Sequence, residues 1–253
     1  MKGKNEEQKV VVPSWYRRVV PEGYVRADLH LEGRSPLLMN SGETDPDSDD
    51  YRAFEALSKA RSKTVEQKAQ LRRLEWSLAL YLDADLGPYI PAKNVQEMLR
   101  ESATKWRRGA DVSRSLVVVE YRIPLLYDGP RDEAGLWAAG YRYTTLVANA
   151  GAGSGRVQRC RPEFADWSLD ATLAFDPEDL DEHLLRMVVE RSQKYGLGDY
   201  RQGKSGGPYG AFAASLSESY TVLGDPTPNG EKVRDATEEK AHAVKVARIQ
   251  TVT

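Results

Sequence analysis

The chain has 253 residues, of which 40% are hydrophobic and 29% are charged, and its formal net charge is -2. This composition is typical of a soluble domain with a sizeable core, and it excludes a protein that attracts polyanions through a global basic field. The single cysteine, Cys160, excludes a disulfide framework and a cysteine-based zinc site. Because no apolar run approaches the ~20 residues of a membrane span, we expect a cytoplasmic protein without a membrane partner.

The first 20 residues are predicted to form an N-terminal arm, ahead of a domain that spans residues 21–223. Residues 25–31 alternate between apolar and polar side chains, which predicts a half-buried strand. An acidic loop follows, and residues 51–82 have a mostly helical pattern. Thr64 and Gln67 have the spacing of a capping box, in which each side chain binds a free backbone N–H at the start of a helix. We interpret residues 47–82 as a helical insertion.

The clearest helix is predicted over residues 94–108, with Asn94 as its N-cap and an apolar stripe that begins at Val95. The stretch "SLVVVEYRIP" is predicted as one strand. Two more strands, "LWAAGYRYTTLVA" and "RVQRCR", flank the glycine-rich "NAGAGSG", so that residues 124–166 are interpreted as a hairpin insertion. The alternating "WSLDATLAF" predicts a further strand.

A second long helix is predicted to open with Asp176 as N-cap and Pro177 at its first position, and to end at Gly196. A glycine-rich loop follows, and "YGAFAASL" is predicted to leave it as a strand. Residues 224–253 are polar and poor in large apolar side chains, which is typical of a flexible tail.

The loop contains "GDYRQGKSGG", which satisfies the P-loop pattern G-x-x-x-x-G-K-[ST] at Gly198, Gly203, Lys204 and Ser205. A P-loop works between a strand and a helix, because the helix N-terminus then aims its N–H groups at the phosphates. Here a helix precedes the loop and a strand follows it, so we reject the nucleotide-hydrolase interpretation. The glycines instead permit positive φ and close backbone approach, which suits either a grip on a phosphodiester backbone or a mobile surface loop.

The predicted order is strand, helix, strand, hairpin insertion, strand, helix, glycine-rich loop and strand. Without the insertions this is a ferredoxin-like (β-α-β-β-α-β, RRM-like) α+β core. With "GPYIPAKNVQEMLRESATK" and "GLGDYRQGKSGGPYGAF", the order resembles the repeat-associated mysterious protein (RAMP) superfamily. The matching positions are Pro88, Ile90, Pro91 and Arg100, and then Gly196, Gly198, Gly207, Tyr209 and Gly210. The stretches "EGRSPLLMNSGE", "RLEWSLALYLD", "RCRPEFADW" and "GLGDYR" also resemble an uncharacterised group of bacteriophage proteins, which would place the chain in a bacterial host cell.

The RAMP resemblance implies a CRISPR-associated type of role, the binding of single-stranded RNA or DNA by repeated copies that form a homo-oligomer or filament along the strand. Cationic, glycine and tyrosine residues from three segments are the predicted binding residues, and no cofactor or metal is predicted. They are Lys93, Arg100, Arg156, Arg159, Arg161, Gly198, Tyr200, Arg201, Lys204 and Tyr209. Tyr141 and Tyr143 are interpreted as cross-strand packing residues.

Two alternatives remain open on the sequence alone. In the resembled superfamily, members that cut RNA use an acidic residue in a loop near the first helix. Asp45, Asp47 and Asp49 are the weak candidates for such a metal-dependent endoribonuclease, although acidic runs of this kind are typical of solvated loops. The second alternative is a phage structural or assembly protein that binds no nucleic acid. Binding is favoured over catalysis, and the enzyme question stays open.

Overall fold

The computed structural model describes residues 17–42, 44–148, 156–217 and 221–222, and within them the chain is a mixed α+β protein with antiparallel sheets. Its central sheet has the strand order β10-β1-β9-β5. The strands are β1 (Val25–Gly33), β5 (Leu116–Val118), β9 (Ser168–Phe175) and β10 (Phe212–Leu216), and every neighbouring pair is antiparallel. The short β11 (Thr221–Val222) extends the edge beside β1. The predicted α+β class is therefore confirmed.

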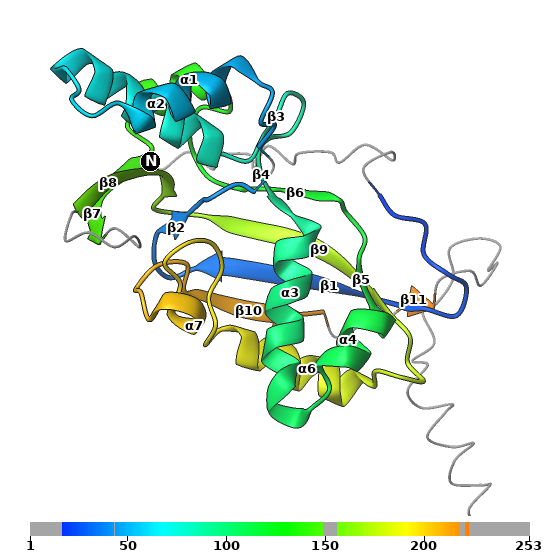
Figure 1. Cartoon of the computed structure of the whole chain (residues 1–253). Coiled ribbons are helices and arrows are strands. Elements are labelled where there is room, and N and C mark those ends of the chain that lie inside the picture. Colours follow the sequence, from blue (N-terminus) through cyan, green and yellow to red (C-terminus); the bar gives the residue numbers. More distant parts are fainter. Residues whose placement is uncertain (1–16, 43, 149–155, 218–220, 223–253) are drawn as a thin grey trace, which may run out of the picture.

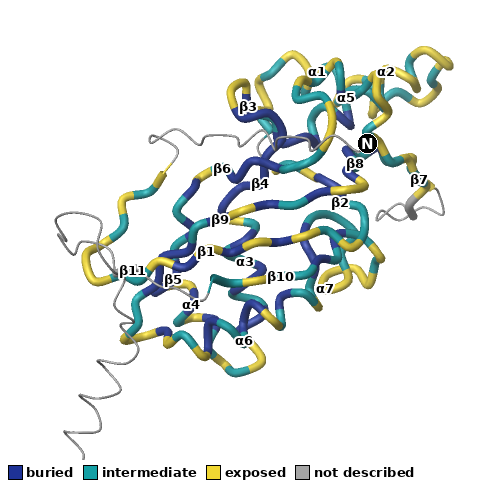
Figure 2. Tube along the Cα trace, turned by 180° about the vertical axis from the view of Figure 1, so that it is seen from behind, coloured by how far each residue is buried: buried dark blue, intermediate teal, exposed yellow. Residues whose placement is uncertain are grey.

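Strand β1 lies in the middle of this sheet and has the alternation that its sequence predicts. Ala27, Leu29 and Leu31 are buried, while the side chains between them are exposed. Helices α3 (Ala92–Ala103), α4 (Gly109–Ser115) and α6 (Glu182–Ser192) cover the buried face, and no described helix lies on the opposite face (Figures 1 and 2). The buried layer between sheet and helices is the core of the domain (Figure 2).

Both long helices of this layer begin elsewhere than predicted. Helix α3 starts at Ala92, directly after strand β4 (Gly87–Pro91), with Pro91 as N-cap and no described side chain capping it, so the predicted Asn94 cap is wrong. Helix α6 begins with Asp181 as N-cap, whose carboxylate accepts from the Leu184 N–H, so the predicted start at Asp176 is wrong as well. Helix α6 thus starts at a second aspartate that can cap it, and α3 starts where strand β4 ends.

Two smaller sheets lie beside the central one. The first has the order β2-β8-β7, with β2 (Leu37–Leu38), β7 (Arg142–Ala148) and β8 (Arg156–Phe164). The second has the order β3-β4-β6, with β3 (Leu82–Asp83) and β6 (Arg122–Pro124). The predicted single strand over 115–124 is wrong, because β5 and β6 belong to different sheets. Residues 136–138 are also helical, as part of α5 (Glu133–Ala138), while β7 and β8 form the expected hairpin, whose tip lies outside the described residues.

The helical insertion consists of α1 (Asp49–Lys59) and α2 (Val65–Ala79), which project at one end of the domain (Figure 1). The capping box of Thr64 and Gln67 at the start of α2 is confirmed. Short helical turns occur at η2 (Thr104–Trp106) and α7 (Gln202–Ser205). Most of the predicted arm and the whole of the predicted tail, residues 224–253, lie outside the described residues. Among the helices that are described, none has the length and apolar character to cross a membrane.

Candidate nucleic-acid interface

The glycine-rich loop, which we define as residues 196–210, connects α6 to β10 and is fixed by backbone hydrogen bonds at three points. The Leu197 N–H donates to the Gly210 carbonyl at 2.9 Å, which closes the loop on itself. The N–H of Gly210 donates to the Pro36 carbonyl, and that of Asp199 donates to the Leu38 carbonyl, both at 2.8 Å. The loop is therefore held against β2 and the residues just before it.

Two glycines show why the loop needs residues without a side chain. Gly198 has φ +84°, and a Cβ there would lie 2.4 Å from the Leu38 carbonyl oxygen. A Cβ at Gly207 would lie 1.9 Å from the carbonyl oxygen of Tyr200. Both distances are far below van der Waals contact, so the predicted need for close backbone approach is confirmed at these positions.

The loop is not a P-loop. Gly203, Lys204 and Ser205 lie within the four-residue α7, whose next regular element is the antiparallel strand β10. Lys204 therefore does not open a long helix, and no parallel strand of the described sheets leads into the loop. The rejection of the nucleotide-hydrolase motif is confirmed by this order.

One side of the loop forms a hollow of about 270 Å³ against helix α3, which we call the α3 groove. It brings together the two segments that carry the sequence resemblance, although about a hundred residues separate them in the chain. Its apolar lining includes Met39, Ile90, Met98 and Leu197. Its polar lining consists of Asn40, Asn94, Glu97, Glu101, Asp199, Arg201 and Lys204.

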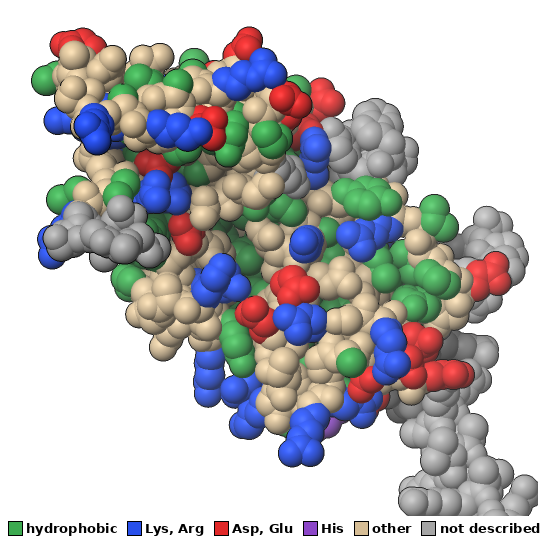
Figure 3. Space-filling model, viewed as in Figure 1, with side chains coloured by type: hydrophobic (Ala, Val, Ile, Leu, Met, Phe, Trp, Pro, Cys, Tyr) green, Lys and Arg blue, Asp and Glu red, His purple; other side chains and the backbone are tan. Residues whose placement is uncertain are grey.

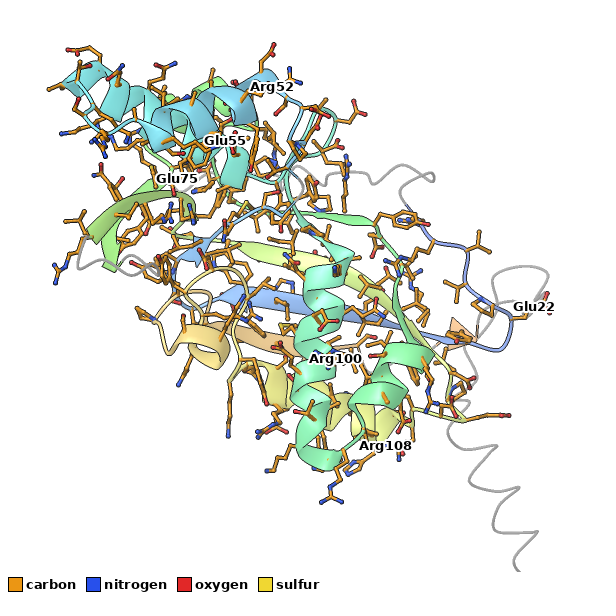
Figure 4. All side chains as sticks on the ribbon, in the orientation of Figure 1. Glu22, Arg52, Glu55, Glu75, Arg100 and Arg108 are labelled. Atoms are coloured by element: carbon orange, nitrogen blue, oxygen red, sulfur yellow. The ribbon has the colours of Figure 1, made fainter. Side chains whose placement is uncertain are left out.

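Most charges around the α3 groove are already paired. Arg100 contacts Glu97 at 2.7 Å, and Arg201 contacts Glu101 at 3.4 Å while also donating to the Gly198 carbonyl at 3.1 Å. Lys93, in the first turn of α3, and Lys204 are exposed to solvent. On the face shown in Figure 3, lysine and arginine side chains are interspersed with acidic ones. Figure 4 shows the same face and labels Arg100 on helix α3. Among the lining residues, the groove therefore offers a phosphate chain one exposed cation without a described carboxylate partner, Lys204, while Lys93 precedes the lining residue Asn94 in the chain.

The other side of the loop forms a second hollow of about 230 Å³ against strand β7, which we call the tyrosine pocket. Its lining residues are Tyr143, Thr145, Tyr200, Ser205, Gly207, Pro208 and Tyr209. The rings of Tyr143 and Tyr209 are 5.1 Å apart between centroids and tilted by 53°. A hydrogen bond from the Tyr209 hydroxyl lowers the pKa of Tyr143, and burial raises the pKa of Tyr200 and of Tyr209.

Tyr143 belongs to this pocket and not solely to the cross-strand packing that its sequence position indicates. Tyr200 has φ +50°, one of two positive φ values among described residues other than glycine. Such a conformation costs of order 1–3 kcal/mol and persists where the surroundings enforce it. Tyr141 does have the expected packing role, since its ring contacts Tyr127 and Phe164.

The three predicted arginines of β8 are in different environments. Arg156 is exposed at the start of the strand. Arg159 and Arg161 both contact Glu75 of α2 at 3.1 Å, and Arg161 also contacts Asp199 at 3.2 Å. Figure 4 shows Glu75 between α2 and the β7–β8 hairpin. The pairing of Arg161, whose side chain is only 12% exposed, links the helical insertion, the hairpin and the glycine-rich loop.

The acidic loop does not bring its candidates together. Asp45 accepts a hydrogen bond from the Asp47 N–H at 2.9 Å, Asp47 contacts Arg52 at 3.1 Å, and Asp49 lies in the first turn of α1. In the described part of the chain, no group of three or more His, Cys, Asp or Glu side chains has the arrangement of a metal site. These contacts are those of an ordinary loop that caps a helix.

Cys160 provides a simple test of the packing between β8 and α2. Its side chain is fully buried, and burial raises the pKa of the thiol. Because the thiolate is the reactive form, we expect the native protein to react with a thiol reagent at pH 8 far more slowly than the denatured protein. Absorbance after addition of a chromogenic disulfide, with and without denaturant, measures this. Rapid native labelling would contradict the packing described here.

No known protein family matches this sequence, and no curated protein matches it. This chain is similar in structure to a chain in the cryo-EM structure of the Type III-B Cmr-beta bound to cognate target RNA. The two chains align with a TM-score of 0.47 and 10% sequence identity, over 77% of this chain and 61% of that chain. The present chain thus spans less than two thirds of that chain's length. A likeness of this size concerns the fold alone and carries no argument about what the present chain binds.

Proposed function

We propose that this protein binds single-stranded nucleic acid across the glycine-rich loop, with the α3 groove and the tyrosine pocket as two parts of one binding surface. The observation that carries the proposal is the position of the loop. Its anchored glycine backbone separates a groove lined by the exposed Lys204 from a pocket lined by three tyrosines. Cations suit phosphates, and tyrosine rings suit unstacked bases, so the pair of hollows suits a single strand.

We further propose that the core is ferredoxin-like and of the RAMP type. If the insertions are omitted, the chain follows the order β1, α3, β5, β9, α6, β10. If these four strands are numbered 1 to 4 in chain order, the sheet order β10-β1-β9-β5 is 4-1-3-2. This is the strand order of a ferredoxin-like β-α-β-β-α-β unit. The glycine-rich loop follows the second helix of this unit, where the sequence resemblance expects it.

We expect this surface to bind single strands with little dependence on their nucleotide sequence. Phosphate contacts do not distinguish sequences, and every base has a face that stacks on an aromatic ring. Such stacking contributes ~1–3 kcal/mol per base. Because Arg100, Arg161 and Arg201 are already paired with carboxylates, the electrostatic contribution falls mainly to Lys93, Lys204 and Arg156.

Salt dependence tests the electrostatic part of the proposal. For about three phosphate contacts on a single strand, log Kobs is expected to fall against log salt with a slope of about -2, at ~0.7 per contact. Fluorescence anisotropy of a labelled strand at several salt concentrations measures the slope. Lys204→Gln should make it shallower by about 0.7, whereas Lys59→Gln, on helix α1, should leave it unchanged. Absence of binding at low salt would refute the proposed function.

Stacking in the tyrosine pocket gives a second expected result. Tyr200→Ala should raise Kd about tenfold, which is within the range for loss of one base–aromatic stack. Tyr200→Phe should retain binding within about twofold, because the ring remains. Tyr121→Ala is the matched control, since Tyr121 is 50% exposed and is not among the residues that line the pocket. Equal losses in the alanine and phenylalanine variants would argue against stacking.

Assembly of repeated copies along a strand is part of the same proposal and has its own experiment. Light scattering of the protein with strands of increasing length should show a stepwise rise in the mass of the complex. A single copy on every strand would exclude the filament, and self-assembly without any strand would favour the alternative of a structural protein. Incubation of the strands with Mg²⁺ and analysis of their length tests the nuclease alternative.

A further inference from the structure

Glu163 differs from the other acidic residues around the glycine-rich loop. Glu75, Glu97, Glu101 and Asp199 each contact an arginine. Glu163 lies in the same region, two residues after Arg161 in β8, and pairs in register with Leu38 of β2. Within the described residues, no hydrogen bond or ion pair to its carboxylate is found. This half-buried carboxylate is therefore left with unused acceptor capacity.

Glu163 lies beside the tyrosine pocket, next to the residues that line it. Alternation along β8 puts its side chain on the same face as Arg161, whose cross-strand partner is Tyr143. Tyr143, which lines the pocket, is therefore a diagonal cross-strand neighbour of Glu163, and the Glu163 carboxylate adds slightly to the burial that raises the pKa of Tyr209. Partial burial raises the pKa of Glu163, which is consistent with the lack of a cationic partner.

An unpaired carboxylate would oppose the binding of a phosphate chain unless it makes a compensating contact. An ionised carboxylate accepts hydrogen bonds and donates none, so it suits a ligand edge that presents N–H groups. Guanine presents two adjacent donors, N1–H and N2–H, on its Watson–Crick edge, which match the two carboxylate oxygens. Cytosine and adenine place an acceptor beside their single amino group, and uracil places its one N–H between two carbonyls.

We infer that the tyrosine pocket prefers guanine, with Tyr143, Tyr200 and Tyr209 surrounding the base and Glu163 accepting from its Watson–Crick edge. This inference rests on the proposed function, since it names the base that the single-strand site takes. It adds a local preference to a surface whose phosphate contacts are indifferent to sequence. Glu163 is the specificity-determining residue of the pocket, and it needs no metal or cofactor to act.

The test uses the full chain and a short labelled oligouridylate with one central nucleotide varied. A central guanine should bind at least about tenfold more tightly than uracil, the effect expected of one or two charge-assisted hydrogen bonds. Hypoxanthine, which lacks the 2-amino group, should lie between them. This comparison uses the unmodified protein, so it does not depend on whether a variant folds.

Glu163→Gln should reduce the guanine preference to within about twofold while it retains or strengthens binding of the plain oligouridylate. Glu190→Gln is the matched control, because it removes the same charge from an exposed position on α6. Equal affinity for all central bases would overturn the inference and leave the proposed function standing. Absence of salt-sensitive binding to every strand would instead refute the proposed function, and the inference with it.

Discussion

Glu75→Ala is expected to lower the free energy of unfolding by about 3 kcal/mol or more. The side chain of Glu75 is only 9% exposed, and its oxygens contact Arg159 and Arg161 at 3.1 Å and accept from the Cys160 N–H at 2.9 Å. Removal of one partner from a buried ion pair costs ~3–5 kcal/mol, because it leaves the other charge buried. We place the value at the lower end because Arg161 keeps Asp199 as a partner. Denaturant unfolding followed by circular dichroism measures the loss.

Two further variants isolate the cause of this loss. Glu75→Gln preserves the shape and the acceptor for the Cys160 N–H, so it should cost less than the alanine variant. Glu55→Ala removes an exposed carboxylate that pairs with Lys59 on α1, and it should change stability by no more than about 0.5 kcal/mol. If Glu75→Ala matched Glu55→Ala, the link between α2, the hairpin and the glycine-rich loop would not be a stabilising one.

Gly210→Ala is expected to destabilise the protein by about 3 kcal/mol or more and to abolish strand binding. Gly210 has φ +64°, and a Cβ there would lie 1.7 Å from the Leu197 carbonyl oxygen. Relief of this overlap requires a backbone shift at the point where the loop closes on itself. Strain at a special φ together with overpacking is among the few mechanisms that give large single-residue effects. Because the loop lines both hollows, its displacement disturbs both parts of the binding surface.

Gly206→Ala in the same loop is the matched control, because it measures the cost of a positive φ without a steric overlap. Gly206 has φ +68°, but a Cβ there would meet nothing within 4 Å. Its substitution should cost only the ~1–2 kcal/mol of a left-handed alanine. The difference between the two variants, measured by denaturant unfolding and by strand anisotropy, gives the contribution of the backbone contact. Equal effects on stability would show that this contact is unimportant.

Much of the fold follows from patterns between residues that are near one another in the chain. The alternation of residues 25–31 predicts the buried and exposed faces of β1, and the spacing of Thr64 and Gln67 predicts the start of α2. The order of helix, glycine-rich loop and strand was enough to reject a P-loop. These features depend on periods of two to about four residues, which a single sequence displays directly.

Element boundaries were predicted less well, since several chemically acceptable starts compete within a few residues. Asn94 and Asp176 are both suitable N-caps, yet α3 and α6 begin at Ala92 and Glu182. The continuous apolar pattern over 115–124 hides the passage of the chain from one sheet to another. Such choices depend on which surface each segment buries, and that surface comes from remote parts of the chain.

Which charged side chains of the candidate site are paired and which are free depends on the tertiary structure. Arg161 and Arg201 appear in the sequence as free cations, but their carboxylate partners Glu75 and Glu101 are 86 and 100 residues away. The same long-range packing brings Tyr143 against Tyr209 and, among the residues that the structure describes, gives Glu163 no arginine partner. The glycine-rich loop and its place between a helix and a strand can be predicted from local sequence patterns alone. Which charges remain free to meet a ligand was decided only by folding, because ion pairing depends on distance in space and not on separation along the chain.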